Sequence, residues 1–77
     1  MFKKNNVYRW NGKKYVCLFV DNSYSCVVPI QPSRKHSGYK LLLSKVALCP
    51  SSFDMMQYDV KKIGIIKDGN YRPIKNN

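Results

Sequence analysis

The hydrophobic residues fall into short runs separated by turn-forming residues, a pattern that favours β-strands over long helices. Residues 6–10 (NVYRW) end at Asn11-Gly12, the dipeptide that most strongly favours a two-residue hairpin turn. The next run, residues 13–20 (KKYVCLFV), is almost continuously apolar. It therefore predicts a central strand that is buried on both faces.

A third strand is predicted at residues 24–30 (YSCVVPI), after a polar turn at residues 21–23 (DNS). Pairing should weaken at Pro29, because proline has no backbone N–H to donate to a neighbouring strand. Residues 31–38 (QPSRKHSG) are rich in polar and turn-forming residues and predict a loop. This loop contains the single histidine of the chain.

The second half of the chain gives a less regular pattern. Residues 39–43 and 45–49 predict either two short strands or one bent strand. Residues 55–64 (MMQYDVKKIG) carry apolar side chains at helical spacing, so they predict one or two helical turns. Asp54 would be the N-cap of this segment and Gly64 its C-cap.

A final hairpin is predicted over residues 65–74, with its turn at Asp68-Gly69. The whole pattern predicts a mainly β fold in a single domain, residues 1–77, with a core of about residues 6–74 and frayed ends. About five to six short strands with one short helical insertion would form a strongly bent sheet or a partly closed barrel. The side chains predicted to fill the core are Val16, Leu18, Phe19, Val20, Val27, Leu42, Val46, Leu48, Ile63 and Ile65.

The charge of the chain is one-sided. Fourteen lysines and arginines (Lys+Arg 14) stand against 4 acidic residues, all of them aspartate, which gives a net charge of +10. A field this positive attracts polyanions and accelerates their encounter with the protein. Nucleic acid is the first partner that this predicts, an anionic membrane surface the second and an acidic protein the third. A membrane-surface binder would be expected to carry a basic amphipathic helix, and the sequence shows none, so no membrane partner is expected.

The three cysteines, Cys17, Cys26 and Cys49, argue against a metal site and against a disulfide-linked fold. They form no Cys-x-x-Cys pair and have a single histidine to join them, so they do not make a zinc ligand set. An odd number of cysteines fits a reducing compartment. The N-terminal residues lack the apolar segment of a signal peptide, and no apolar run approaches the roughly 20 residues of a membrane span. We therefore expect a cytoplasmic protein without a metal or another cofactor.

The polar loop contains the sequence SRKH at residues 33–36, whose side chains would supply the groups needed to cleave RNA without a metal ion. In such a reaction the 2′-hydroxyl attacks the neighbouring phosphorus, so the site needs a proton acceptor, a proton donor and cations near the phosphate. His36 would transfer the proton, while Arg34 and Lys35 would bind the phosphate. Ser33 or Gln31 would hold the substrate in place. The alternative is a loop that positions a phosphate without any chemistry.

Further cations and aromatic residues flank this loop. Lys13 and Lys14 follow the first hairpin turn, and they would face the same phosphate if that hairpin folds over the loop. Most aromatic residues are expected to stabilise the sheet, and about two to stack on a ligand. The predicted nucleic-acid-binding residues are Lys13, Lys14, Arg34, Lys35, Tyr39 and Lys40. The predicted catalytic residues are Gln31, Ser33, Lys35 and His36.

Four stretches occur in an order that resembles a known family: GKKYVCLFV, VVPIQPSRKHSG, KVALCPSSF and DVKKIGII. The sequence is similar to the compact endoribonuclease toxins of the MazF/PemK superfamily, which includes the ToxN-like toxins. The resemblance covers about residues 6–66. It implies an SH3-like barrel that binds single-stranded RNA and cleaves it without a metal ion. It also implies a homodimer, or a protein or RNA antitoxin as a partner.

The resemblance also assigns roles by position. Lys13 or Lys14 corresponds to the basic residue that precedes the second strand in this family. Gln31 or Ser33 corresponds to the threonine or serine after VVPI, and Lys35 to the lysine that follows. Two functions are therefore predicted as alternatives. One is a metal-independent endoribonuclease toxin that leaves 2′,3′-cyclic phosphate ends. The other is a non-catalytic SH3-like module that binds nucleic acid or an acidic protein, as a small regulator or inhibitor.

Overall fold

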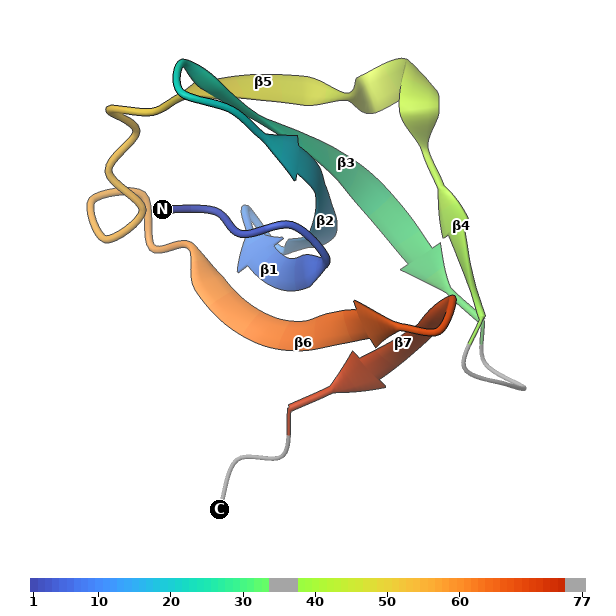
Figure 1. The fold of residues 1–77 in the computed structure, drawn as a ribbon. Coiled ribbons are helices and arrows are strands. Elements are labelled where there is room, and N and C mark those ends of the chain that lie inside the picture. The colour runs from blue at the N-terminus through green and yellow to red at the C-terminus, as the bar shows by residue number, and fades with distance from the viewer. Residues whose placement is uncertain (34–37, 75–77) are drawn as a thin grey trace.

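The computed structural model describes residues 1–33 and 38–74, which form seven strands and one short 3-10 turn (Figure 1). The predicted site residues Arg34, Lys35 and His36 lie outside the described residues. The elements are β1 (Asn6–Trp10), β2 (Lys13–Val20), β3 (Tyr24–Pro32), β4 (Tyr39–Leu41), η1 (Leu43–Lys45), β5 (Ala47–Pro50), β6 (Lys61–Lys67) and β7 (Asn70–Pro73).

The strands form one antiparallel sheet that curls into a nearly closed barrel (Figure 1). β1, β2 and β3 follow one another as a meander, and β5 pairs with the first half of β3. β6 then returns to pair with the free side of β1, and β7 pairs with β6. The order β6-β1-β2-β3-β5 is that of a small SH3-like barrel, so the predicted fold class is confirmed.

The two predicted hairpin turns form where the sequence indicates. At the β1–β2 turn, Asn11 and Gly12 have φ angles of 54° and 74°. At the β6–β7 turn, Asp68 and Gly69 have φ angles of 53° and 76°. Positive φ at both central residues is the geometry of a type I′ turn, which asparagine, aspartate and glycine adopt at least cost. These short turns fix the register of both hairpins.

Pro29 marks the point at which the outer neighbour of β3 changes. On its inner side β3 pairs with β2, with Tyr15 opposite Pro29. On its outer side it pairs with β5 as far as Val27 and with β4 from Ile30 onward. The Pro29 carbonyl accepts a hydrogen bond from the Leu42 N–H at 2.9 Å, so the missing N–H of the proline also faces this outer side. The predicted weakening of pairing at Pro29 is thus found as a change of partner strand.

Buried side chains form two clusters on the two faces of the sheet. One cluster contains Phe2, Tyr8, Cys17, Val27, Cys49 and Val60, and the other contains Val7, Val16 and Ile30. Val16 and Cys17 are neighbours in β2, where successive side chains point to opposite faces, so the centre of β2 is buried on both faces as predicted. The predicted core residues that are only partly buried are Leu18, Val20, Leu42, Ile63 and Ile65.

Three predicted core residues are exposed instead: Phe19 (47%), Val46 (48%) and Leu48 (62%). A bulge between Cys17 and Phe19 shifts the alternation of side chains in β2, so the two residues do not share a face. In β5, Cys49 takes the inward position, and the adjacent Leu48 therefore points outward. Val46 lies between η1 and β5, outside any strand.

Residues 55–59 form hydrogen-bonded turns, so the prediction of helical turns over residues 55–64 is wrong. Asp54 does cap this segment, because its Oδ1 accepts hydrogen bonds from the N–H groups of Met56 (3.1 Å) and Gln57 (3.3 Å). Gly64 does not end a helix but lies within β6. Pairing with β1 holds this segment extended and overrides the local helical spacing.

The single helical segment in the described part of the chain is η1, which separates β4 from β5. The region of residues 39–49 therefore forms two short strands rather than one bent strand. Within residues 1–33 and 38–74, no helix has the length and the apolar character needed to cross a membrane.

Candidate nucleic-acid interface

The hairpin of β3 and β4 carries four of the predicted site residues at its end. Gln31 lies opposite Lys40 and Pro32 opposite Tyr39, so β3 extends into the segment that the sequence predicts as a loop. A hollow of about 330 Å³, which we call the hairpin hollow, is lined by Gln31, Pro32, Ser33, Tyr39 and Lys40. The structure thus brings Gln31, Ser33, Tyr39 and Lys40 into one place.

Lys14 lies in a different hollow from the residues of the hairpin. This second hollow, of about 300 Å³, we call the cationic hollow. Its lining residues are Arg9, Lys14, Lys62, Ile63, Tyr71, Pro73 and Ile74. Lys13 is exposed at the start of β2, opposite Trp10. Lys14 therefore does not line the same hollow as Gln31, Ser33, Tyr39 and Lys40.

Strand pairing brings the cations of the cationic hollow together. Arg9 in β1 lies directly opposite Lys14 in β2, and Lys62 reaches the same hollow from β6 on the other side of β1. Lys14 Nζ lies 5.7 Å from the centre of the Tyr71 ring, within the range of a cation–π contact. Burial raises the pKa of Tyr71, and the nearby Arg9 guanidinium partly opposes this rise. The phenol therefore stays protonated and can donate a hydrogen bond to an anion.

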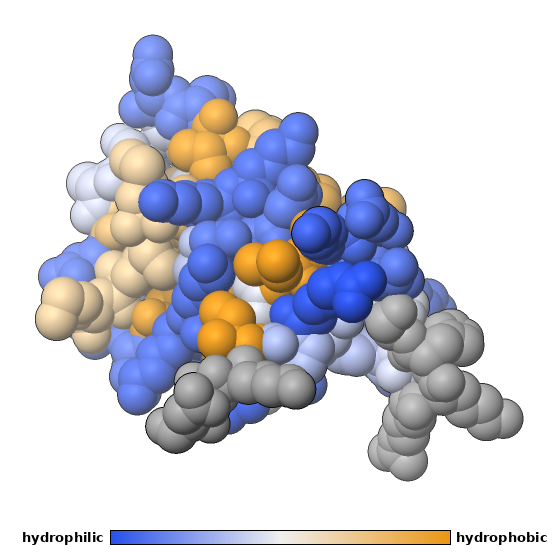
Figure 2. Space-filling model, turned by 60° about the horizontal axis from the view of Figure 1, so that its bottom comes forward, coloured by the Kyte–Doolittle hydropathy of each residue, from blue (hydrophilic) through white to orange (hydrophobic). Residues whose placement is uncertain are grey.

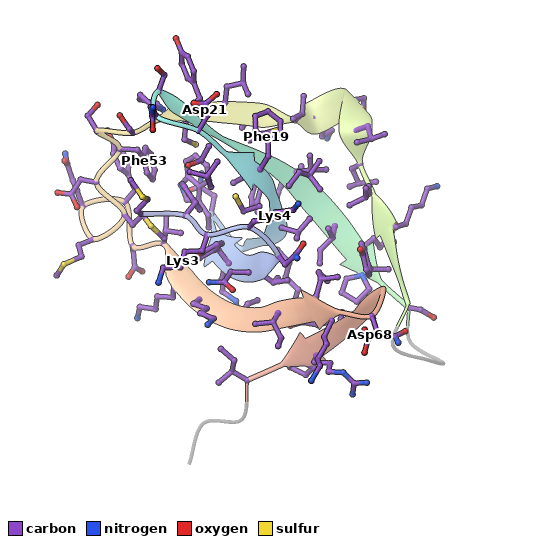
Figure 3. The ribbon with its side chains drawn as sticks, viewed as in Figure 1. Lys3, Lys4, Phe19, Asp21, Phe53 and Asp68 are labelled. Atoms are coloured by element: carbon purple, nitrogen blue, oxygen red, sulfur yellow. The ribbon has the colours of Figure 1, made fainter. Side chains whose placement is uncertain are left out.

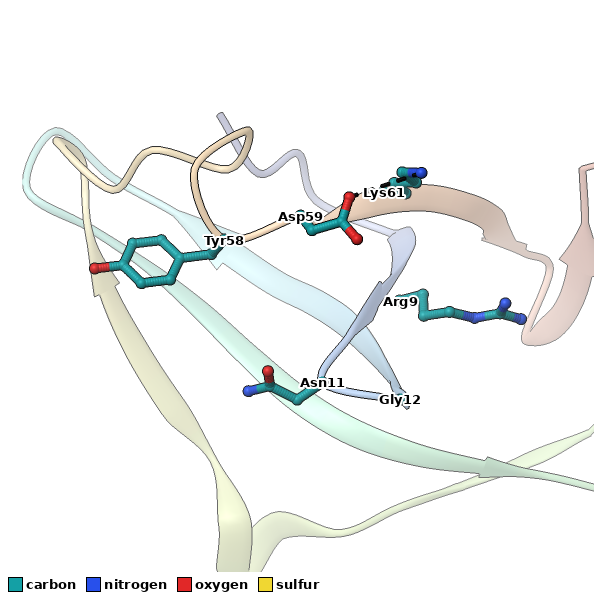
Figure 4. Close-up of a pocket in the computed structure, with 6 residues that line it drawn as sticks. All are labelled: Arg9, Asn11, Gly12, Tyr58, Asp59 and Lys61. Carbon is teal, nitrogen blue, oxygen red and sulfur yellow. Dashed lines mark ion pairs between the residues drawn. The ribbon is translucent and has the colours of Figure 1, made fainter.

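A third hollow, of about 410 Å³, lies between the β1–β2 turn and the turn before β6 (Figure 4). We call it the turn hollow, and its lining residues are Arg9, Asn11, Gly12, Tyr58, Asp59 and Lys61. Arg9 lies opposite Lys61 in the β1–β6 pairing and lines both this hollow and the cationic hollow. Lys61 Nζ lies 3.7 Å from Asp59 Oδ1, and both side chains are mostly exposed, so this ion pair is weak.

A chain of aromatic rings leads from the core to the turn hollow. Phe53 stacks on Phe2 at 5.6 Å between ring centroids and packs against Trp10 at 5.2 Å. Tyr58 then stacks on Phe53, with ring centroids 4.9 Å apart and an interplanar angle of 13°. Tyr58 is 52% exposed, so it presents a ring to solvent that the rings behind it hold in place. An exposed ring of this kind is a surface on which a nucleobase can stack.

All acidic residues lie in turns, and the strands carry basic charge alone. Asp21, Asp54, Asp59 and Asp68 all fall outside the strands, with Asp21 and Asp68 at distant ends of the molecule (Figure 3). The strand cations are Arg9, Lys13, Lys14, Lys40, Lys61, Lys62, Lys67 and Arg72. Of the cations that the structure describes, Lys61 alone forms an ion pair. Hydrophilic side chains cover most of the face on the β6–β7 side, with apolar side chains in separate spots (Figure 2).

The three cysteines do not provide a reactive thiol. Cys17, Cys26 and Cys49 are free and buried on neighbouring strands. Burial raises the pKa of Cys17 to about 11, and it raises the pKa of Cys49 above its usual 9.0. A thiol with a raised pKa is a poor nucleophile at neutral pH, because the thiolate is the reactive form. Within the described ranges, no three His, Cys, Asp or Glu side chains are grouped so as to hold a metal ion.

No protein-family model, no curated protein and no solved structure matches this chain.

Sequence reasoning missed Arg9 and Lys62 as candidate binding residues. They are distant in sequence, and the return of β6 onto the free side of β1 brings them together. No local pattern encodes that pairing. The one available signal was the pair Lys61-Lys62 at the start of an apolar run, which resembles Lys13-Lys14 at the start of β2.

Proposed function

We propose that this small barrel binds single-stranded RNA through the surface formed by β1, β2 and β6. The observation that carries the proposal is the cationic hollow, where Arg9, Lys14 and Lys62 converge on one space beside the phenol of Tyr71. In the part of the chain that the structure describes, no acidic residue lines this hollow or lies in any strand around it. A phosphate group would therefore meet three cations and the hydroxyl of Tyr71, beside the apolar side chains of Ile63, Pro73 and Ile74.

A flexible single strand fits this surface better than a duplex does. Duplex DNA is usually read by a protruding helix or ribbon that enters a groove, and the strands here form hollows instead. Proteins that bind single strands combine a basic surface with exposed aromatic rings, and Tyr58 provides such a ring in the turn hollow, which Arg9 also lines. RNA is the preferred polyanion because the sequence resembles the MazF/PemK and ToxN-like toxins.

Binding would rest on phosphate contacts that release bound counterions. Arg9 can hold a phosphate through two parallel hydrogen bonds, while Lys14 and Lys62 add point charges. For single strands the affinity then falls with salt, with a log–log slope of about −0.7 for each phosphate neutralised. Loss of one contact should therefore reduce the steepness of the salt dependence as well as the affinity.

The test measures fluorescence anisotropy of a labelled mixed-sequence single-stranded RNA over a series of salt concentrations. Lys62→Ala removes a cation that lines the cationic hollow, and Lys67→Ala removes one from the same strand that lines none of the three hollows. We expect Lys62→Ala to weaken binding and to reduce the slope by about 0.7, with a smaller effect of Lys67→Ala. Equal effects of the two variants, or no binding by the wild type at low salt, would refute the proposal.

The hairpin hollow supports a second candidate function, metal-independent cleavage of the bound RNA. Gln31 and Ser33 precede residues 34–37 in the chain, Tyr39 and Lys40 follow them, and all four line one hollow. A positioning group and a cation would thus flank the loop that contains His36. Incubation of mixed-sequence RNA in EDTA tests this directly. Cleavage predicts fragments with 2′,3′-cyclic phosphate ends that disappear in His36→Ala and Lys35→Ala, whereas intact RNA excludes it.

A further inference from the structure

The turn hollow and the cationic hollow are adjacent but differ in chemistry. Arg9 lines both of them, so its side chain is the border that the two hollows share. Among the described residues, no carboxylate lines the cationic hollow, whereas the turn hollow contains Asp59. A carboxylate repels a phosphate but accepts hydrogen bonds from N–H groups. The two hollows are therefore suited to different parts of one nucleotide chain.

We propose that the turn hollow binds a single nucleobase of the RNA and prefers guanine. This inference rests on the proposed function. The base would enter between the β1–β2 turn and Tyr58, while the adjoining phosphate would lie against Arg9 and the cationic hollow. The volume of about 410 Å³ falls within the range of small-ligand sites.

The preference for guanine follows from the hydrogen-bonding groups of the bases. The Watson–Crick edge of guanine carries two adjacent donors, N1–H and the N2 amino group, which match the two oxygens of a carboxylate. In adenine, cytosine and uracil the donor on this edge lies beside an acceptor, which a carboxylate would repel. Asp59 is the single acidic residue among those that line the three hollows, and its carboxylate lies between the side chains of Tyr58 and Arg9 in the view of Figure 4.

Asp59 is held in position by its backbone, and its ion pair with Lys61 is weak. Its backbone has a φ of 55°, and the segment is closed by hydrogen bonds from the Asp59 N–H to the Met56 carbonyl (3.2 Å) and from the Val60 N–H to the Met55 carbonyl (2.9 Å). Its ion pair with Lys61 is 3.7 Å long and exposed, so a base can displace it. Lys61 would then be free to approach the adjoining phosphate.

Tyr58 gives the base a stacking surface, and contact with Phe53 already holds its ring in place before the RNA binds. One face of its ring already rests on Phe53 at a centroid distance of 4.9 Å, and the ring is half exposed. Because the ring is fixed by its neighbours, stacking costs little side-chain entropy. Tyr58→Ala should therefore weaken binding of base-containing RNA more than binding of the same strand with one abasic position.

The experiment measures binding of labelled oligouridylates with one central position that is guanine, inosine, adenine or uracil. Inosine keeps N1–H but lacks the N2 amino group. We expect the guanine strand to bind roughly 10-fold more tightly than the adenine and uracil strands, with inosine between them. Asp59→Asn should abolish this order. Asparagine tolerates positive φ, so the turn should persist in this variant.

Asp54→Asn is the matched control. Like Asp59→Asn, it removes one negative charge from this segment, and the asparagine side-chain oxygen can still cap the turn. Residue 54 does not line the turn hollow. Loss of the guanine preference in Asp59→Asn with its retention in Asp54→Asn would establish the pocket. Salt-dependent RNA binding without a guanine preference would overturn the inference and leave the proposed function intact. So would a preference that survives in Asp59→Asn or disappears in both variants. Absence of RNA binding by the wild type would overturn both.

Discussion

Gly64 lies so close to Tyr71 that a Cβ atom at position 64 would be 2.6 Å from Tyr71 Cε1. The same Cβ would be 2.8 Å from the carbonyl oxygen of Arg72. Gly64 is buried in β6, and Tyr71 belongs to the neighbouring strand β7. The missing side chain therefore lets the Tyr71 ring lie against the sheet, where it lines the cationic hollow.

Gly64→Ala is expected to destabilise the protein by about 1–3 kcal/mol, because the added methyl group overpacks a closed site. It should also weaken RNA binding, since the Tyr71 ring must move. Urea unfolding and anisotropy measure the two effects. Gly69→Ala is the control, because a Cβ at position 69 would meet no atom within 4 Å. Alanine at a φ of 76° should lower the free energy of unfolding by about 1 kcal/mol and leave RNA binding unchanged. If Gly64→Ala were as stable as the wild type, the close contact between position 64 and Tyr71 would be contradicted.

Val27→Ala is expected to lower the free energy of unfolding by about 2 kcal/mol, because Val27 is fully buried and the change leaves a cavity. Leu48→Ala removes more atoms but from a side chain that is 62% exposed, so its effect should be below about 0.5 kcal/mol. Urea unfolding of both variants measures the difference. A larger loss for Leu48→Ala would mean that Leu48 is buried, for instance by self-association.

Stability at low pH should depend on Asp21. Its Oδ1 accepts hydrogen bonds from the N–H groups of Ser23 and Tyr24, both at 2.7 Å, and these bonds lower the pKa of Asp21 below its usual 3.8. A carboxyl with a lowered folded-state pKa stabilises the fold above its unfolded-state value, and this contribution is lost as pH falls through the folded-state value. Urea unfolding at neutral pH and near pH 3 should show a larger decrease for the wild type than for Asp21→Asn. Parallel decreases would show that the turn does not depend on the charge.

The thiols of the native protein should resist modification. Burial raises the pKa of Cys17 to about 11, and Cys26 and Cys49 are also buried. We expect Ellman's reagent at mildly alkaline pH to react at least roughly 100-fold more slowly with the native protein than with the chain in urea. All three thiols should react after unfolding. Rapid reaction of one thiol in the native state would show that its strand opens locally.

Turn chemistry made much of the fold predictable. Asn11-Gly12 and Asp68-Gly69 specify positive φ at two successive positions, a requirement that few residues meet, so the sequence at these points leaves little freedom. Asp21 identifies the β2–β3 turn in the same way, through hydrogen bonds to its own backbone. Local rules of this kind placed the three hairpins formed by β1, β2, β3, β6 and β7.

The errors arose where neighbouring strands decide the outcome. Phe19 would share a face with Cys17 in a regular strand, and the bulge between them separates the two. Leu48 is more hydrophobic than its neighbours, but pairing with β3 turns Cys49 inward instead. The helical spacing around Gly64 is real, yet pairing with β1 holds that segment extended. Each of these results depends on a contact between residues far apart in sequence.

The candidate site was predictable only where its residues are close together in the sequence. The hairpin hollow unites residues close in sequence, such as Gln31 and Lys40, and the sequence placed them together. The cationic hollow depends on the β1–β6 pairing, which places Lys62 opposite Tyr8 and so beside Arg9. Closure of a barrel is a property of the whole sheet, so a reading of local patterns could not have found this site.

Arg9 lies between Lys14 and Lys61 on neighbouring strands, and this row of three cations affects the stability of the protein. Like charges directly opposite one another in a sheet repel, so this row weakens the free protein. Selection for stability alone would favour an acid at one of the three positions, as in a Lys14→Glu variant with a higher melting temperature. A polyanion bound as proposed would offset this repulsion. The molecule is thus expected to be at its most heat-resistant when it is occupied, and its natural stability to be a property of the complex.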